Sequence, residues 1–200
     1  MTKIKMCGMM RPKDVINACE LGVDYIGFIL SEGFRRTVVL GTFCELESYA
    51  HGYDVQKVGV FVNEPIDNIC GYYAEMLDMI QLHGNENDRY IAELRHRTGK
   101  PVIKAFKIHS AEDVTAAEKS TADYILLDSG TGTGKTFDWS LISGIKRKFF
   151  LAGGLTAENV GEAIKKLAPY AVDASSCLEK DGFKYFEKMK AFAEAVRQAG

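Results

Sequence analysis

Residues 149–176 read FFLAGGLTAENVGEAIKKLAPYAVDASS, and this stretch decides the expected fold. It begins with the apolar run 149–152 and ends with a second short run at 171–174. Between them, Thr156 and the acidic residue that follows it are typical of the first turn of a helix. Because runs this short and this apolar suit buried parallel strands, the stretch predicts a strand, a covering helix and a second parallel strand.

The same alternation of apolar runs and amphipathic segments continues along the whole chain. Eight runs have the length and composition of buried strands, at residues 4–6, 25–30, 55–62, 76–82, 102–106, 124–127, 149–152 and 171–174. Apolar residues at helical spacing fill most of the gaps, including 13–21 and 184–198. The gap at 39–51 is less regular, and the one at 139–145 leaves room only for a short helix.

Eight such units predict an α/β fold of the (β/α)8 TIM barrel type, and the alternative is an open doubly wound sheet built from the same units. Two details favour the closed barrel. The strand count is eight, and glycines gather after the seventh and eighth strands rather than after the first. The chain shows no linker or low-complexity tract, so we expect residues 1–200 to form a single domain.

Composition excludes several classes of protein. The 200 residues carry a formal net charge of −2, with 46% hydrophobic and 26% charged residues, as in ordinary globular proteins. Lysine and arginine do not gather into one basic face, so neither nucleic acid nor an anionic membrane is expected as a partner. No apolar run approaches the roughly 18 residues that span a bilayer, and no secretory signal is visible at the amino terminus. We therefore expect a cytoplasmic protein.

The cysteines support the same compartment. There are five of them, widely spaced and without a C-x-x-C pair. This pattern is neither a disulfide framework nor a zinc site, so we expect reduced thiols and no metal.

In a (β/α)8 barrel the loops that follow the strands build the active site. Most of these loops begin with residues that could take part in catalysis or ligand binding. They are Cys7, Arg35, Arg36, Asn63, His83, Asp128, Gly153, Gly154, Ser175 and Ser176. The fold alone does not require such residues at so many strand ends. Their distribution predicts a functional site at the carboxyl-terminal end of the barrel.

A phosphate site is predicted after the last two strands. Gly153 and Gly154 have no Cβ, so their backbone N–H groups can approach an anion closely. Ser175 and Ser176 are expected to begin a short extra helix whose N–H groups and hydroxyls favour a phosphate. Alone, these pairs would be a tight turn and a helix cap, but in consecutive units they match the phosphate site of many barrels.

The segment Ser129-Gly-Thr-Gly-Thr-Gly-Lys-Thr136 is similar to a nucleotide-binding P-loop but does not match it. That motif needs a glycine where Ser129 stands. We expect either a mobile glycine-rich loop that covers a bound ligand or a flexible connector.

Cys7 and Asp128 are the candidate proton-transfer groups. By position alone, Cys7 on a buried strand is more often a packing residue. Asp128 is different, because a carboxylate directly after an apolar strand costs desolvation free energy unless it is paired or used. Facing each other across the mouth of a barrel, a thiolate base and a carboxylic acid would form a proton-transfer pair.

At these positions the chain resembles the phosphoribosylanthranilate isomerase family of tryptophan biosynthesis. The resemblance covers essentially the whole chain, and an ordered set of matches is far more specific than any one of them. The matching segments are Lys5-Met-Cys-Gly8, Val58-Gly-Val-Phe-Val-Asn63, Gln81-Leu-His-Gly84, Leu126-Leu-Asp128, Gly134-Lys-Thr-Phe-Asp-Trp139, Leu151-Ala-Gly-Gly-Leu155 and Val172-Asp-Ala-Ser-Ser176.

The resemblance implies a (β/α)8 barrel that performs an Amadori rearrangement of N-(5-phosphoribosyl)anthranilate without metal or cofactor. Asp128 matches the family's general acid and Cys7 its general base, with Lys5 or the surroundings of the substrate lowering the pKa of the thiol. Arg36 matches the arginine that holds the anthranilate carboxylate. His83 and Asp173 are implied to line the substrate site.

The chain also departs from the family pattern. Cys177 stands where the family usually has glycine, next to the expected phosphate site. The proline often found before the substrate-binding arginine is missing, which leaves the choice between Arg35 and Arg36 open.

Two other functions remain as alternatives: another isomerase or lyase acting on a phosphorylated sugar, and a non-catalytic metabolite sensor that keeps the ligand site. Association with other enzymes of the pathway is left open.

Overall fold

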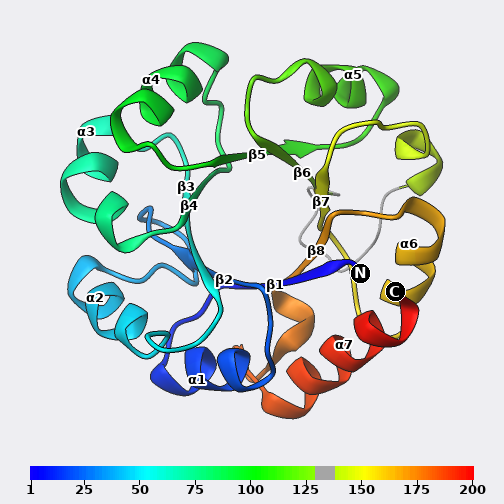
Figure 1. Ribbon diagram of the computed structural model, residues 1–200, viewed down its shortest axis with the longest axis horizontal. Helices are drawn as coiled ribbons and strands as arrows, with labels where there is room; N and C mark the ends of the chain where they lie inside the picture. The colour runs from blue at the N-terminus through cyan, green and yellow to red at the C-terminus, as the bar shows by residue number, and fades with distance from the viewer. Residues whose placement is uncertain (129–137) are drawn as a thin grey trace.

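The computed structural model describes residues 1–128 and 138–200, and its centre is a closed barrel of eight parallel strands (Figure 1). Each strand pairs with the next one along the chain, and β8 pairs with β1 to close the ring. The closed order β1 to β8 confirms the (β/α)8 barrel and excludes the open doubly wound sheet.

The strands and helices have the following bounds. The barrel strands are β1 (Lys3–Cys7), β2 (Tyr25–Ile29), β3 (Gln56–Phe61), β4 (Met79–Leu82), β5 (Val102–Lys107), β6 (Tyr124–Asp128), β7 (Phe149–Leu151) and β8 (Ala171–Ala174). The helices around them are α1 (Pro12–Glu20), α2 (Leu40–Ser48), α3 (Ile66–Asn68), α4 (Asp88–Thr98), α5 (Ala111–Lys119), α6 (Val160–Leu167) and α7 (Phe186–Ala199). Within these described ranges, no helix is long and apolar enough to cross a membrane.

Shorter elements complete the described chain. A π-helix at Ile69–Tyr73 and a 3₁₀-helix at Ala74–Met76 follow α3. Between β6 and β7, a 3₁₀-helix at Trp139–Ile142 occupies the place where only a short helix was expected. After β8 come another 3₁₀-helix, Ser176–Leu178, and an antiparallel hairpin of β9 (Glu179–Lys180) and β10 (Phe183–Lys184). The hairpin was not predicted, because two-residue strands leave no periodic signal in a sequence.

The start of α6 differs from the prediction. The helix begins at Val160 instead of at Thr156, because the side chain of Asn159 folds back over the preceding turn. Its Oδ1 accepts from Thr156 N at 2.8 Å, and its Nδ2 donates to Gly154 O at 2.9 Å. The four residues before the helix therefore form a turn that holds the glycine pair.

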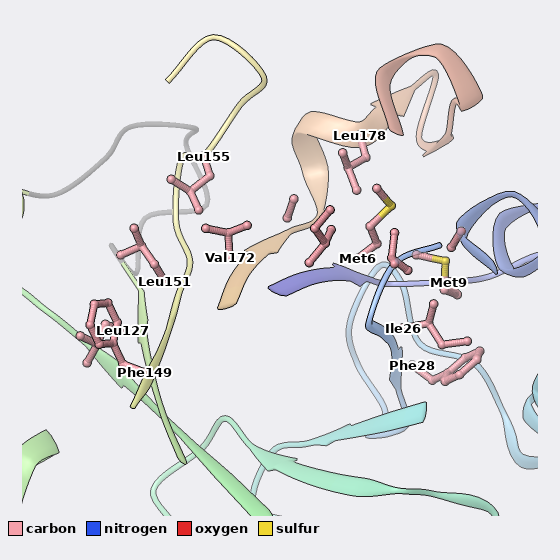
Figure 2. Packing of buried hydrophobic residues seen from close by; sticks show 14 of the residues in the cluster. Met6, Met9, Ile26, Phe28, Leu127, Phe149, Leu151, Leu155, Val172 and Leu178 are labelled. Carbon is pink, nitrogen blue, oxygen red and sulfur yellow. The ribbon is translucent and has the colours of Figure 1, made fainter. Parts of the chain in front are cut away.

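The apolar core has two layers, because successive side chains on a strand point to opposite sides of the barrel. The outer layer packs strands against helices; Figure 2 shows part of it, with Met6 from β1 and Ile26 and Phe28 from β2. The inner layer fills the barrel with side chains that include Val58, Leu126 and Phe150. Lys5 and Cys7 flank the outward-facing Met6 on β1, so both point into the barrel.

Aromatic rings close the amino-terminal end of the barrel. Tyr25 and Tyr124 are the first residues of β2 and β6, and their rings pack edge-on against Phe150 at centroid distances of 5.3 and 5.8 Å. The Tyr25 hydroxyl lies 2.9 Å from that of Tyr170, just before β8. Because this end is filled by rings, polar side chains inside the barrel are confined to the opposite end.

We expect Phe150→Ala to lower the free energy of unfolding by about 3–5 kcal/mol, because it removes a fully buried ring and leaves a cavity among packed neighbours. Urea denaturation measures the loss. Tyr53→Ala, at an exposed tyrosine, is the matched control and should change stability by about 0.5 kcal/mol or less. A loss below about 1 kcal/mol in Phe150→Ala would mean that the rings do not hold the barrel together.

Candidate active site

A cavity of about 800 Å³ lies at the carboxyl-terminal ends of the strands. It brings together side chains and backbone from segments far apart in the sequence. Its lining includes Cys7, Arg36, His83, Asp128, Gly153, Gly154, Asp173, Ser175 and Ser176. The sequence had suggested all nine of these residues for catalysis or binding, and the structure brings them to one cavity. Asn63 and Arg35, two other residues at strand ends, are not part of this lining.

Cys7 is the last residue of β1 and is buried at the base of the cavity. The neighbouring strand leaves room for its sulfur, because a Cβ at Gly27 would lie 2.7 Å from Cys7 Sγ. Burial raises the pKa of the Cys7 thiol above its ordinary value, and the ammonium group of Lys5 opposes this rise. The thiol thus lines the cavity and needs a cation beside it to ionise near neutral pH.

Lys5 and Asp173 form a buried ion pair beside Cys7. The two residues are directly opposite in the β1–β8 register, and Lys5 Nζ lies 3.0 Å from Asp173 Oδ2. Burial alone would lower the pKa of Lys5. The Asp173 carboxylate and, after it, Cys7 have the opposite effect, and together they raise the pKa of Lys5 above its ordinary value. The second oxygen of Asp173, Oδ1, has no hydrogen-bond partner among the described residues. Asp173 also lines the cavity, so its carboxylate is a candidate acceptor for a hydroxyl group there.

His83 stands between Gln81 and Asp128. Gln81 Nε2 lies 3.0 Å from His83 Nδ1. In this orientation of the amide, Gln81 donates to Nδ1, and a neutral ring then carries its proton on Nε2. His83 Nε2 lies 3.7 Å from Asp128 Oδ2. Burial lowers the pKa of His83 despite the nearby carboxylate, which leaves the imidazole neutral at pH 7.

The residues predicted to bind phosphate lie in two turns at the same cavity. Gly153 and Gly154 adopt φ values of 82° and 67°, a left-handed conformation that side chains disfavour. Across the same cavity, Ser175 Oγ donates to Cys7 O at 2.8 Å. The Ser175 hydroxyl proton is thus directed at β1, and all four residues of the two turns line the cavity.

The two adjacent arginines differ in what they can reach. Arg36 lines the cavity and its side chain is 18% exposed, whereas the side chain of Arg35 is 55% exposed and lies outside that lining. Arg36 passes closely over Gly8, where an added Cβ would lie 2.5 Å from Arg36 Cδ. Both arginines bind Glu179. Of the two candidates that the sequence left open, Arg36 is the one that lines the cavity.

Sequence reasoning missed a buried charged pair that supports His83. Glu86 accepts from Asn63 N at 2.7 Å and from Gly84 N at 2.9 Å, and Lys104 lies 3.0 Å from it and donates to Gly84 O. Asn63 thus shapes the turn after His83 instead of lining the cavity. Lys104 did carry a signal, since a lysine in the middle of a buried apolar strand needs a partner.

The glycine-rich segment 129–136, expected to cover a ligand or to connect flexibly, lies outside the described residues. Within residues 1–128 and 138–200, no group of three or more histidine, cysteine or acidic residues is placed to hold a metal ion.

Known proteins resemble the chain over nearly its whole length. A family model described as N-(5'phosphoribosyl)anthranilate (PRA) isomerase matches residues 4–195. The N-(5'-phosphoribosyl)anthranilate isomerase of Caldanaerobacter subterraneus subsp. tengcongensis is 40% identical over 205 residues, which cover 98% of this chain and 98% of the relative. That of Streptococcus gordonii is 41% identical over 202 residues, with 98% of both chains covered.

Solved structures agree with these relatives. Phosphoribosyl anthranilate isomerase from Thermotoga maritima superposes with a TM-score of 0.90 at 32% identity, covering 99% of this chain and 100% of that chain. A phosphoribosyl anthranilate isomerase in complex with reduced 1-(o-carboxyphenylamino)-1-deoxyribulose 5-phosphate superposes with a TM-score of 0.87 at 32% identity and the same coverage.

The charges around Cys7 predict its reactivity. At about pH 7.5 iodoacetamide should alkylate Cys7 much more slowly than the exposed Cys44, because burial raises the pKa of Cys7 and only the thiolate reacts. Lys5→Met removes the cation that lowers this pKa and should slow alkylation further. Asp173→Asn removes a carboxylate that raises it and should speed alkylation.

Peptide mapping by mass spectrometry across a pH series measures each rate, and circular dichroism checks that both variants fold. Alkylation of Cys7 as fast as that of Cys44, or shifts of the same sign in the two variants, would contradict this electrostatic account.

Proposed function

Since the chain belongs to the N-(5'-phosphoribosyl)anthranilate isomerase family, we propose that Cys7 and Asp128 are the base and the acid of its reaction. The chain is an isomerase of tryptophan biosynthesis, which converts N-(5'-phosphoribosyl)anthranilate into 1-(2-carboxyphenylamino)-1-deoxyribulose 5-phosphate by an Amadori rearrangement. One observation carries the assignment of residues: Cys7 and Asp128 end two strands that are not neighbours in the barrel, yet both line the same cavity.

The substrate has a charged group at each end, and the cavity offers partners for both. The anthranilate carboxylate binds Arg36, and the aromatic ring lies near Phe34, an apolar residue of the same lining. The ribose then lies between the two ends, against Cys7 and Asp128. The phosphate binds the turns that contain Gly153, Gly154, Ser175 and Ser176.

The acid step opens the sugar ring. Asp128 donates a proton to the ring oxygen, the bond from C1 to that oxygen breaks, and the nitrogen lone pair forms the C1=N bond of an iminium ion. Neutral His83 presents its Nε2 hydrogen towards Asp128 at 3.7 Å, where it helps to orient the carboxyl group. Since the iminium nitrogen becomes the electron sink, the reaction needs no metal or cofactor.

The base step completes the rearrangement. The Cys7 thiolate takes the proton from C2, the C–H electron pair forms a C1=C2 bond, and the nitrogen recovers its lone pair. The resulting enol becomes the ketone when C1 gains a proton and the C2 hydroxyl loses one, so the overall reaction is an isomerisation with no net proton change. Lys5 stabilises the thiolate, and the Asp173 carboxylate accepts a hydrogen bond from a ribose hydroxyl.

Charge and composition support the remaining proposals. A net charge of −2 without a basic face suits a small anionic substrate held at a local site and gives no support to a nucleic-acid partner. We place the protein in the cytoplasm, in keeping with reduced cysteines.

Turnover of freshly made phosphoribosylanthranilate, followed by the loss of its fluorescence, tests the acid and the base. Cys7→Ala and Asp128→Asn should each lower kcat by about 10²–10⁴-fold, because each removes one proton-transfer group. Binding of the reduced product analogue should change little in both variants. Cys44→Ala and Asp67→Asn, at an exposed cysteine and an exposed aspartate, are the matched controls.

Turnover that persists in Cys7→Ala would keep the activity but remove Cys7 as the base. Loss of analogue binding together with kcat would show that the substitution disturbs the site instead of one chemical step.

A further inference from the structure

The β9–β10 hairpin places a carboxylate behind Arg36. Glu179, the first residue of β9, has a side chain only 7% exposed and lies among three cations. Arg36 contacts it from the cavity side, Arg35 from the exposed side, and Lys184 from β10. An eight-unit barrel does not require this hairpin, so the cluster is a feature in its own right.

The hydrogen bonds of Arg36 leave one side of its guanidinium for a ligand. Arg36 Nε donates to Glu179 Oε1 at 2.5 Å, and Nη2 donates to Oε2 at 3.2 Å. Within the described part of the chain, these are the hydrogen bonds of Arg36. A guanidinium has five N–H groups in a planar fork, so Nη1 and the second hydrogen of Nη2 form another fork of the same geometry. That outer fork matches a second carboxylate.

Glu179 is itself fixed from behind. Lys184 has a fully buried side chain whose Nζ lies 2.9 Å from Glu179 Oε1 and 3.0 Å from Ser175 O. Arg11 Nη2 in turn donates to Lys184 O at 2.9 Å. A chain of contacts thus runs from the Ser175 turn through Lys184 and Glu179 to Arg36, and Arg36 has little freedom to rotate.

The cluster keeps the charge that a carboxylate ligand needs. Burial alone would raise the pKa of Glu179, but Arg36, Arg35 and Lys184 lower it to about 2, so the group is ionised at neutral pH. One negative charge among three cations leaves a net positive cluster. Glu179 therefore restricts Arg36 without cancelling the attraction for an anion.

We propose that Glu179 is a positioning residue that fixes Arg36 with its outer fork directed at the anthranilate carboxylate. This inference rests on the proposed function. Glu179 could either orient Arg36 or compete with the substrate for it, and these two roles predict opposite changes in substrate binding when Glu179 loses its charge. If Glu179 mainly orients Arg36, its loss weakens substrate binding; if it mainly competes for Arg36, its loss strengthens binding.

The test is a double-mutant cycle between Glu179→Gln and Arg36→Met. Glu179→Gln should raise KM for phosphoribosylanthranilate about tenfold while kcat changes by about threefold or less, because the contact lies far from the reacting bonds. In the Arg36→Met background, Glu179→Gln should have no further effect on KM, since Glu179 acts through Arg36. Glu179→Asp keeps the charge but shortens the side chain, and should give an intermediate KM.

Binding measurements separate this proposal from the proposed function. The reduced product analogue, which carries the carboxylate, should bind about tenfold more weakly to Glu179→Gln, whereas ribose 5-phosphate, which lacks it, should bind as in the wild type. Glu194→Gln, at an exposed ion pair on α7, is the matched control and should leave both constants unchanged. Wild-type turnover and the Cys7 and Asp128 variants test the function independently.

A lower or unchanged KM in Glu179→Gln would overturn the proposal. An equal further rise of KM in the Arg36→Met background would also overturn it, as would equal weakening of ribose 5-phosphate.

Discussion

The ion pair between Lys5 and Asp173, 3.0 Å apart, joins the first barrel strand to the last. Two charges inside a barrel are costly to desolvate, and only close pairing across the seam makes their burial tolerable. The pair therefore depends on barrel closure in one register, since a slip of β1 by one residue would turn Lys5 outward and leave Asp173 without its partner. The same pair sets the charge beside Cys7 and holds Asp173 in the lining of the cavity. Closure of the barrel and the charge around Cys7 thus depend on the same ion pair.

The interior of the barrel is divided to make this contact possible. Tyr25, Tyr124 and Phe150 fill the amino-terminal end with rings, and the cavity lies at the other end. There, Lys5 and Lys104 each reach a buried carboxylate on a neighbouring strand or loop. Because both ammonium groups are held by fixed carboxylate partners, the electrostatic field at the carboxyl-terminal end of the barrel does not depend on mobile surface side chains.

The sequence predicts the fold well because buried parallel strands are short apolar runs and the residues after them are polar. Cys7, His83 and Asp128 were found this way, and the structure brings them to one cavity. Contacts between distant segments are not visible in this pattern. Glu179 was missed because its partner Arg36 lies more than a hundred residues away, and the hairpin that carries it is too short to show periodicity. Arg35 and Arg36 could be separated only by the direction of their side chains.

The opposing effects on Cys7 have a consequence for the order of the proposed steps. A buried thiol with a raised pKa is a stronger base once ionised, but it is mostly protonated before substrate binds. Lys5 reduces this penalty without removing it, because its own charge is shared with Asp173. Ring opening by Asp128 creates a cationic iminium next to the thiol. That new positive charge favours the thiolate at the moment when C2 must lose its proton, so the acid step prepares the base step.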